Sequence, residues 1–161
     1  CTLNNQVLWG SIGWATPAAF GAAIADRARR VVLITGDGSH QLTAQEVSTM
    51  MRHNLNIVII VINNSGYTIE RILSDNPMDK FNDIAKWHYS KLPSVFDGNA
   101  WAAEAHTERE FDEALKQADM QENSGLRYIE IFTDMFDVPY LTKRVVKNLR
   151  EKNENKVFLV R

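Results

Sequence analysis

The sequence predicts an α/β fold: a three-layer sandwich with a mostly parallel sheet and helices on both faces. Residues 57–62 form an unbroken run of isoleucine and valine, which is typical of a strand covered on both faces in a parallel sheet. Strand-like segments alternate with helix-like segments along the chain, as they do in parallel α/β proteins. The length of 161 residues suits one domain, and we expect residues 1–161 to form it.

Each expected element has a local reason in the sequence. Short apolar runs rich in β-branched residues indicate strands, and capping-box spacing marks two helix starts, at Thr43 with Glu46 and at Thr107 with Glu110. Pro139 suits the first turn of a helix. In chain order we expect a helix over residues 16–28, a strand over 31–35, a helix over 43–53, a strand over 57–62, a helix over 68–73, an irregular segment over 74–98, a strand over 100–106, a helix over 107–120, a strand over 126–132 and a helix over 139–152.

Composition narrows the class of protein. Hydrophobic residues make up 45% of the chain, enough for a substantial core. The formal net charge of −2 gives no electrostatic reason to expect nucleic acid or an anionic membrane as a partner, and the longest apolar run is far short of the roughly 20 residues that cross a bilayer. The only cysteine is Cys1, so no internal disulfide is possible and we expect a reducing compartment, the cytoplasm.

Two polar loops follow the first two expected strands. Gly36-Asp37-Gly38-Ser39 comes after one strand and Asn63-Asn64-Ser65-Gly66 after the next, and ligands of parallel α/β sheets bind beyond the carboxyl ends of the strands. Backbone N–H groups in glycine-rich turns hold phosphate well, but Asp37 would repel phosphate unless a cation lay between them. A carboxylate, neutral oxygens and phosphate oxygens are the usual ligands of Mg²⁺; Asn64 and the Gly66 carbonyl offer the neutral oxygens.

A plainer interpretation treats both loops as ordinary turns. Gly-Asp-Gly is also a tight turn and Asn-Asn-Ser-Gly a polar loop, because turns use these residue types heavily. The loops lack the GxxxxGK[ST] pattern of a P-loop and the GxGxxG pattern of dinucleotide-binding proteins. The position of each loop directly after an expected buried strand favours a ligand site.

The two loops and their spacing resemble the thiamine diphosphate-binding motif, with Gly-Asp-Gly at residues 36–38 and, after residues 39–62, Asn-Asn at 63–64. Further segments resemble the 2-keto acid decarboxylases, which include pyruvate, indolepyruvate, phenylpyruvate and branched-chain keto acid decarboxylases. These segments are WGSIG at residues 9–13, GDGSHQLTAQE at 36–46, NNSGYTIER at 63–71 and FNDIAKWHYSKLP at 81–93. The resemblance covers nearly the whole chain and implies the C-terminal domain of such an enzyme, which binds the diphosphate of the cofactor.

The resemblance implies roles for the residues of both loops. Asp37, the Asn64 side chain and the Gly66 carbonyl correspond to Mg²⁺ ligands, with two diphosphate oxygens and a water completing the octahedron. Gly38 and Ser39 correspond to residues that contact the diphosphate. These five positions would together hold the charged end of the cofactor.

Other residues correspond to positions around the reacting part of the cofactor. The Gly10 carbonyl corresponds to the acceptor for the pyrimidine amino group, and Ile12 to the apolar residue that bends the cofactor into its V shape. In this family a glutamate at the position of Glu70 assists the proton transfer that releases the aldehyde, and a carboxyl in an apolar cleft suits a proton donor. Ile69 corresponds to a wall of the substrate pocket. The alternative for Glu70 is a solvated helix residue paired with a cation such as Arg71.

The implied function is that of a non-oxidative 2-keto acid decarboxylase that uses thiamine diphosphate and Mg²⁺ and produces an aldehyde and CO₂. In this family the active site also needs a pyrimidine-binding domain from a second subunit, and no part of residues 1–161 resembles that domain. We therefore expect a fragment of a homo-oligomeric enzyme that is inactive by itself. Two alternatives stay open: a carboligase of the acetolactate synthase or benzoylformate decarboxylase type, and a non-catalytic cofactor-binding module. The Gly-Tyr-Thr-Ile-Glu run at residues 66–70 favours the decarboxylases.

Overall fold

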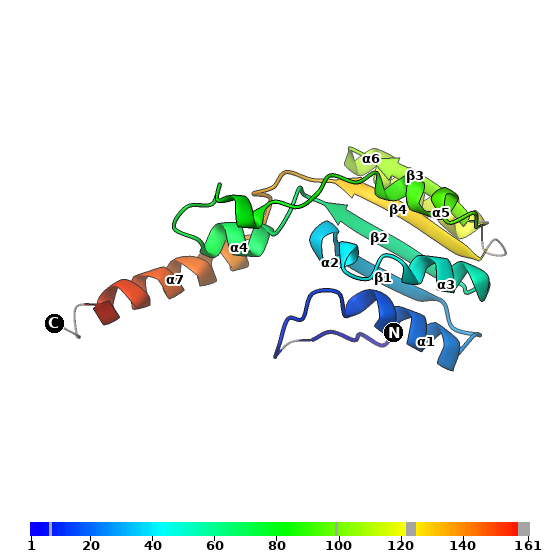
Figure 1. Cartoon of the computed structure of the whole chain (residues 1–161), viewed down its shortest axis with the longest axis horizontal. Coiled ribbons are helices and arrows are strands. Elements are labelled where there is room, and N and C mark those ends of the chain that lie inside the picture. The colour runs from blue at the N-terminus through cyan, green and yellow to red at the C-terminus, as the bar shows by residue number, and fades with distance from the viewer. Residues whose placement is uncertain (7, 99, 122–124, 158–161) are drawn as a thin grey trace.

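The computed structural model describes residues 1–6, 8–98, 100–121 and 125–157. Within these ranges, four parallel strands form a sheet in the order β1-β2-β4-β3 (Figure 1). The expectation of an α/β fold with a parallel sheet is confirmed. In chain order the elements are α1 (Ala15–Ala25), β1 (Val31–Gly36), α2 (Asp37–Gln41), α3 (Glu46–Arg52), β2 (Ile57–Asn63), α4 (Thr68–Leu73), the 3₁₀ turns η1 (Lys80–Asn82) and η2 (Tyr89–Lys91), α5 (Leu92–Val95), β3 (Ala100–Ala105), α6 (Glu108–Met120), β4 (Leu126–Phe132) and α7 (Tyr140–Val157).

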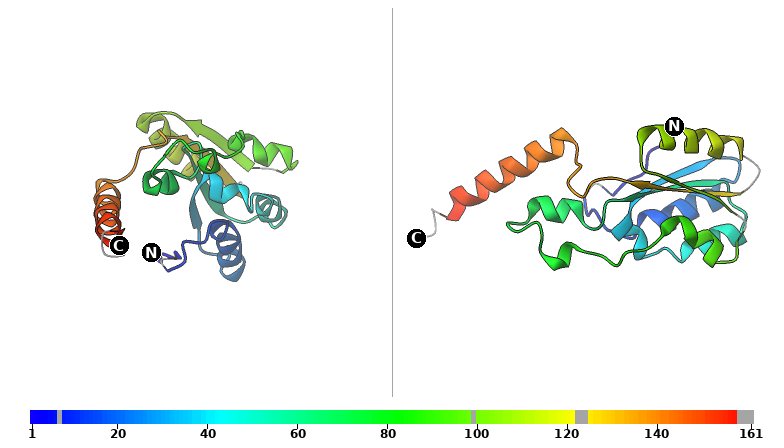
Figure 2. Two further views of the ribbon diagram at one scale, coloured as in Figure 1. Left: turned by 60° about the vertical axis from the view of Figure 1, so that its left-hand side comes forward. Right: turned by 90° about the horizontal axis from the view of Figure 1, so that it is seen from above.

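Helices lie on both faces of the sheet, and each face has its own apolar core. The view from above on the right of Figure 2 shows α6 on one side of the strands and α1 and α3 on the other. The core on the α1 and α3 side includes Ala19, Leu33, Val47, Met50, Ile57 and Ile59. The core on the α6 side includes Val58, Ile60, Ala114, Ala118 and Ile129. The sheet is therefore the middle of three layers, and β2 is buried on both faces as its apolar run predicts.

The first strand is buried on one face only, which corrects the expectation of a buried strand there. Leu33 points into the core, but Val32 and Ile34 on the other face are 55% and 62% exposed. Their register partners on β2, Val58 and Ile60, are buried on the α6 side. Because α6 packs against β3 and β4, it leaves this face of β1, the last strand of the described sheet, uncovered.

One of the two expected capping boxes forms. Thr107 is the N-cap of α6, and its Oγ1 accepts a hydrogen bond from the Glu110 N–H at 3.2 Å. The Glu110 carboxylate in turn accepts from the His106 N–H at 2.8 Å. Two N–H groups at the helix start, which the helix itself leaves unpaired, are thereby satisfied.

The other expected capping box, at Thr43, does not form, so this prediction is wrong. Helix α3 begins at Glu46, and the Thr43 hydroxyl instead donates to the Gly13 carbonyl at 2.9 Å. The chain leaving β1 enters the short helix α2, whose first residue is Asp37, where a loop was expected. Thr43 therefore ties the turn before α1 to the segment after α2, which is a long-range role that local spacing does not reveal.

The last helix, α7, projects away from the sheet. It contacts α4, and Figure 1 shows both helices beyond the carboxyl ends of β2 and β4. Leu141 and Val145 of α7 are exposed apolar side chains. Across the described ranges, no helix has both the length and the apolar composition needed to cross a bilayer. The carboxyl edge of the sheet is thus flanked by two helices with apolar surface.

A buried chain of hydrogen-bonded polar side chains links α1, α2 and β4. His40 is fully buried; its Nδ1 lies 3.0 Å from Thr16 Oγ1 and its Nε2 lies 2.8 Å from the Tyr128 hydroxyl oxygen. Burial lowers the pKa of His40 to about 4, so the imidazole is neutral near pH 7. A neutral ring offers one donor and one acceptor, and the two hydroxyls pair with both.

Acid should destabilise this fold through His40. The unfolded chain binds a proton on this residue as pH falls below its ordinary pKa of 6.5, whereas the folded chain resists protonation until about pH 4. Stability is therefore lost as pH falls through that window, by roughly 3 kcal/mol in total. Urea unfolding of the wild-type chain and of His40→Asn at pH 7 and pH 4.5 measures the effect. From pH 7 to pH 4.5, the free energy of unfolding should fall less in the variant than in the wild type. An equal loss in both proteins would contradict the assignment.

Candidate functional site

The two polar segments meet at the carboxyl edge of β1 and β2. Gly36 pairs with Ile62 in the parallel ladder, so the chain leaves both strands at the same level. The Gly66 N–H then donates to Asp37 Oδ2 at 3.1 Å and joins two segments that are 29 residues apart. The structure therefore brings together the residues that the sequence pattern groups.

The Asp37 carboxylate is buried at the centre of this edge. Its Oδ1 accepts from the Gly38 N–H at 2.7 Å and its Oδ2 from the Gly66 N–H. Burial raises the pKa of Asp37, and the hydrogen bonds from Gly38 and Gly66 only partly oppose that effect. The charged form is thus less favourable here than in water, and a neighbouring positive charge would stabilise it.

The Asn64 amide lies between Asp37 and Gly66. One of its two terminal atoms is 2.9 Å from the Gly66 carbonyl oxygen and 3.2 Å from Asp37 Oδ1, and the other is 2.9 Å from the Thr68 hydroxyl. With nitrogen inward, the amide donates to both oxygens. With oxygen inward, three oxygens face one another, and a cation between them would offset their repulsion.

These separations suit a small cation. Adjacent ligands of an octahedral Mg²⁺, with bonds of about 2.1 Å, lie about 3.0 Å apart, close to the distances that join the Asn64 amide to Gly66 and Asp37. Among the residues that the structure describes, no cluster of three or more histidine, cysteine or acidic side chains offers a different metal site. One carboxylate with neutral oxygens is the donor set that this edge provides.

Glycine is required at two positions of the site. A Cβ atom on Gly38 would overlap the ring of Tyr67, and a Cβ atom on Gly66 would overlap the carbonyl oxygen of Asn82. Gly66 also has φ +128°, a conformation that other residues rarely adopt. The sequence motifs identify these segments but give no signal for the contacts of the two glycines with Tyr67 and Asn82, because those contacts depend on how the segments pack in the fold.

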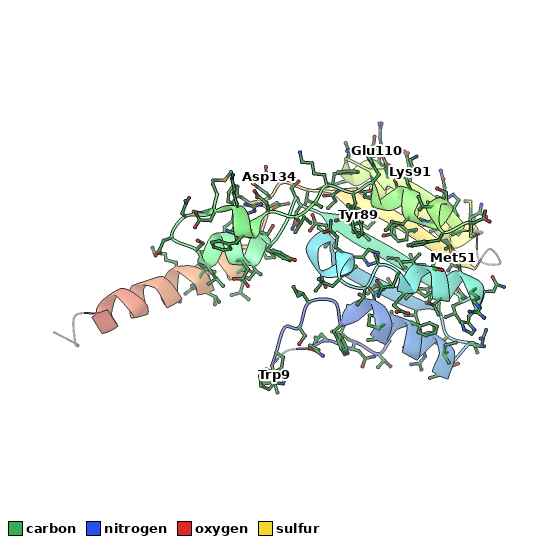
Figure 3. The ribbon with its side chains drawn as sticks, in the orientation of Figure 1. Trp9, Met51, Tyr89, Lys91, Glu110 and Asp134 are labelled. Atoms are coloured by element: carbon green, nitrogen blue, oxygen red, sulfur yellow. The ribbon has the colours of Figure 1, made fainter. Side chains whose placement is uncertain are left out.

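Ser39 connects the site to the N-terminal segment. Its hydroxyl oxygen accepts from the Gly13 N–H at 2.9 Å, which leaves the hydroxyl proton to donate elsewhere. Gly10 and Ile12 are exposed in this segment, and Figure 3 shows Trp9 at its outer end, away from the sheet. No hydrogen bond among the described residues joins Gly10 or Ile12 to the cluster around Asp37.

Glu70 and Ile69 lie in the first turn of α4, and both are exposed. The apolar cleft expected around Glu70 is not formed by the described residues. The alternative expectation is an ion pair between Glu70 and Arg71. Arg71 is instead buried and pairs with Asp83 at 2.7 Å, so this expectation is wrong. The Glu70 carboxylate is thus open to groups from outside this part of the chain.

Sequence reasoning missed a second buried carboxylate beside the site. Glu130, within β4, is fully buried and accepts from the Asn63 side-chain amide at 2.7 Å and from the Ser90 N–H at 2.8 Å. Tyr89, which Figure 3 places near α2, is buried and accepts from the Gln41 side-chain amide at 2.8 Å. The sequence signal that could have identified Glu130 is a glutamate inside a mostly apolar strand, because a buried carboxylate needs hydrogen-bond donors around it.

Fold and site together define a class: a parallel α/β domain in which a buried carboxylate and neutral oxygens converge at the carboxyl edge of the sheet. Residues 2–131 match the family described as "Thiamine pyrophosphate enzyme, C-terminal TPP binding domain". The chain belongs to this family. The resemblance drawn from its motifs is therefore confirmed.

Three proteins to which the chain is similar are named decarboxylases. The chain is 43% identical over 140 residues to pyruvate decarboxylase isozyme 1 of Saccharomyces cerevisiae, and this alignment covers 84% of the chain and 25% of the yeast protein. It is 40% identical over 149 residues to alpha-keto-acid decarboxylase of Mycobacterium bovis, covering 92% and 26%. The solved structure of benzoylformate decarboxylase from Polynucleobacter necessarius superposes with a TM-score of 0.69 and 25% identity, over 81% of this chain and 25% of that one. The chain spans about a quarter of the length of these proteins.

Replacing Gly66 by alanine should destabilise the chain by at least about 2 kcal/mol, since the φ of this residue and the Asn82 carbonyl both oppose a side chain. Gly21→Ala is the matched control. A Cβ atom there meets nothing within 4 Å, and alanine inside a helix should stabilise the chain by roughly 0.5–1 kcal/mol. Urea unfolding of the three proteins separates the two effects, and equal stability of Gly66→Ala and wild type would refute the packing argument.

Proposed function

We propose that this chain binds thiamine diphosphate and Mg²⁺ as the diphosphate domain of a longer, non-oxidative 2-keto acid decarboxylase that releases an aldehyde and CO₂. The convergence of Asp37, Asn64 and Gly66 at the carboxyl edge of β1 and β2 carries this proposal. The identities of 43% and 40% to a pyruvate decarboxylase and an alpha-keto-acid decarboxylase support the reaction class.

The loops would hold the charged end of the cofactor. Asp37, the Asn64 amide oxygen and the Gly66 carbonyl would bind Mg²⁺, with the Asn64 amide turned so that its oxygen faces inward. Gly38 and Ser39 would contact the diphosphate; the Ser39 hydroxyl proton is free for this, because its oxygen already accepts from the Gly13 N–H. The cation would offset the burial of Asp37 that raises the pKa of its carboxyl.

The remaining residues would act on the reacting end. When bound, thiamine diphosphate supplies the carbon nucleophile and the positive ring that takes up the electrons left by CO₂. The Gly10 carbonyl would accept from the pyrimidine amine, and Ile12 would support the bent cofactor. Glu70 would move the proton that completes the aldehyde, and Ile69 would line the substrate pocket.

The exposure of Glu70 and Ile69 fits an active site completed by another part of the enzyme. We propose a pyrimidine-binding domain, contributed by a second subunit of a homo-oligomer, as the part that covers them. A cytoplasmic location belongs to the same proposal, since the one cysteine is a free thiol. The chain alone would then bind cofactor weakly or not at all, and would not turn over.

A carboligase of the acetolactate synthase or benzoylformate decarboxylase type is the second candidate, since the chain also superposes on a benzoylformate decarboxylase with a TM-score of 0.69. The identity of 25% in that comparison is lower than the 40% and 43% found for the keto acid decarboxylases. Incubating the complete enzyme with pyruvate, phenylpyruvate and branched-chain keto acids decides: free aldehyde supports the proposal, whereas acyloin or acetolactate supports a carboligase. No turnover of any of them supports a non-catalytic module.

Asp37→Ala should abolish Mg²⁺-dependent binding of thiamine diphosphate in the complete enzyme, because it removes the one charged ligand that these loops supply to the proposed site. Isothermal titration calorimetry with and without Mg²⁺ measures this. Asp75→Ala, which removes an exposed carboxylate from the loop after α4, is the control and should bind as wild type does. Cofactor binding by Asp37→Ala at the wild-type level would contradict the assignment of Asp37 as a Mg²⁺ ligand.

Glu70→Gln should lower kcat by about 10²- to 10⁴-fold, the usual contribution of a positioned proton donor or acceptor, while the Kd for thiamine diphosphate stays unchanged. Glu108→Gln, an exposed glutamate of α6, should leave both quantities unchanged. Steady-state kinetics and calorimetry on the same preparations supply the comparison. A normal kcat in Glu70→Gln would show that Glu70 does not take part in the proton transfer.

A further inference from the structure

Arg71, in α4, lies directly behind the Gly66 turn. Its side chain is only 1% exposed, and a Cβ atom placed on Gly66 would lie 3.0 Å from Arg71 Nη2. A guanidinium is costly to bury unless oxygens surround it. The oxygens around Arg71 therefore indicate what this side chain holds in place.

The guanidinium binds oxygens from two separate segments. Nη2 donates to the Ser65 carbonyl at 3.0 Å and to Asp83 Oδ1 at 2.7 Å. Nη1 donates to the Pro77 carbonyl at 3.1 Å. Arg71 thereby joins the turn that follows β2 to residues 77–83, which lie on the other side of α4 in the chain.

One peptide unit lies between Arg71 and Asp37. Its carbonyl, from Ser65, accepts from Arg71, and its N–H, from Gly66, donates to Asp37 Oδ2 at 3.1 Å. No cis peptide bond occurs among the described residues, and in a trans peptide the carbonyl and the N–H point in opposite directions. Guanidinium and carboxylate therefore hold the same peptide plane from its two sides.

This plane needs support from outside. Ser65 has φ +62° and Gly66 has φ +128°, so the chain turns through two uncommon backbone conformations at the point where the Gly66 carbonyl and N–H must be placed. Hydrogen bonds in series also strengthen one another in a buried setting. The positive charge behind the Ser65 carbonyl thus makes the Gly66 N–H a better donor to Asp37.

We propose that Arg71 is a positioning residue of the cation site: by fixing the Ser65–Gly66 peptide, it sets the orientation of the Asp37 carboxylate and of the Gly66 carbonyl. The inference rests on the proposed function, since these orientations matter to a bound cation. Groups that orient metal ligands from outside change metal affinity by about 10- to 100-fold. Lysine does not replace arginine fully, because it lacks the planar fork that reaches several oxygens at once.

The test titrates Mg²⁺ into the complete enzyme at saturating thiamine diphosphate and follows binding by calorimetry. Arg71→Met keeps most of the stem and removes all donors, so it should weaken Mg²⁺ binding by about 10- to 100-fold; Arg71→Lys should fall between this variant and wild type. Met50→Ala is the control for stability alone. It removes buried packing in α3 and should lower the melting temperature without changing the affinity for Mg²⁺.

A second readout needs no cofactor. In the cation-free protein, the Gly66 amide should exchange its hydrogen faster in Arg71→Met than in wild type, relative to the amides of β2. Wild-type Mg²⁺ affinity in Arg71→Met, or an equal loss of affinity in Met50→Ala, would overturn the inference. If Arg71→Met does not fold, wild-type affinity in Arg71→Lys overturns it. If the wild-type enzyme itself shows no Mg²⁺-dependent binding of thiamine diphosphate, the proposed function fails. Titration of the wild-type enzyme detects this outcome separately from the effect of the Arg71 variants.

Discussion

The parallel pairing of β1 with β2 is the constraint on which the site depends. Gly36 pairs with Ile62, and this register places Asp37 and the turn after β2 at one level, close enough for the Gly66 N–H to reach the Asp37 carboxylate at 3.1 Å. A slip of two residues would keep every apolar side chain on its own face but move the two segments apart by about 7 Å. The buried side chains of β2 therefore do more than fill the core: their fit against both layers of helices holds the register that assembles the site.

Buried charge is the second feature of this edge of the sheet. Asp37, Glu130 and Arg71 are each at most 1% exposed, and backbone groups of the surrounding turns supply hydrogen-bond partners to all three. Such groups are expensive to bury and are poor contributors to stability compared with apolar residues of the same size. Asp37 and Arg71 both bind the Ser65–Gly66 peptide, and Glu130 holds the Asn63 side chain at the end of β2. A site needs such groups when its geometry must be set before the ligand arrives, because each of them restricts the orientation of the groups that it touches.

Local sequence signals predict the sheet well and the supports of the site poorly. The apolar runs of β2 and β4 mark strands whatever the rest of the chain does, and the Gly-Asp-Gly and Asn-Asn segments mark the edge where they meet. Thr43 shows the limit of local spacing, since its hydroxyl pairs with Gly13 rather than capping a helix. The contacts of Arg71 with residues 77–83 have no local signature either, because they depend on how an irregular segment returns to α4. Family resemblance marks the groups that would touch a ligand, but not the groups that hold those in place.

The open face of β1 also bears on how copies of the chain interact with one another. Val32 and Ile34 present β-branched side chains to water, and β1 is the last strand of the described sheet, with one side of its backbone unpaired there. A strand of this kind is a template onto which another copy adds. While this face is exposed, pairing between copies can lead to aggregation, and the tendency grows as the concentration of the chain rises. The strand that leads into Asp37 is thus also an edge at which copies of the chain can aggregate.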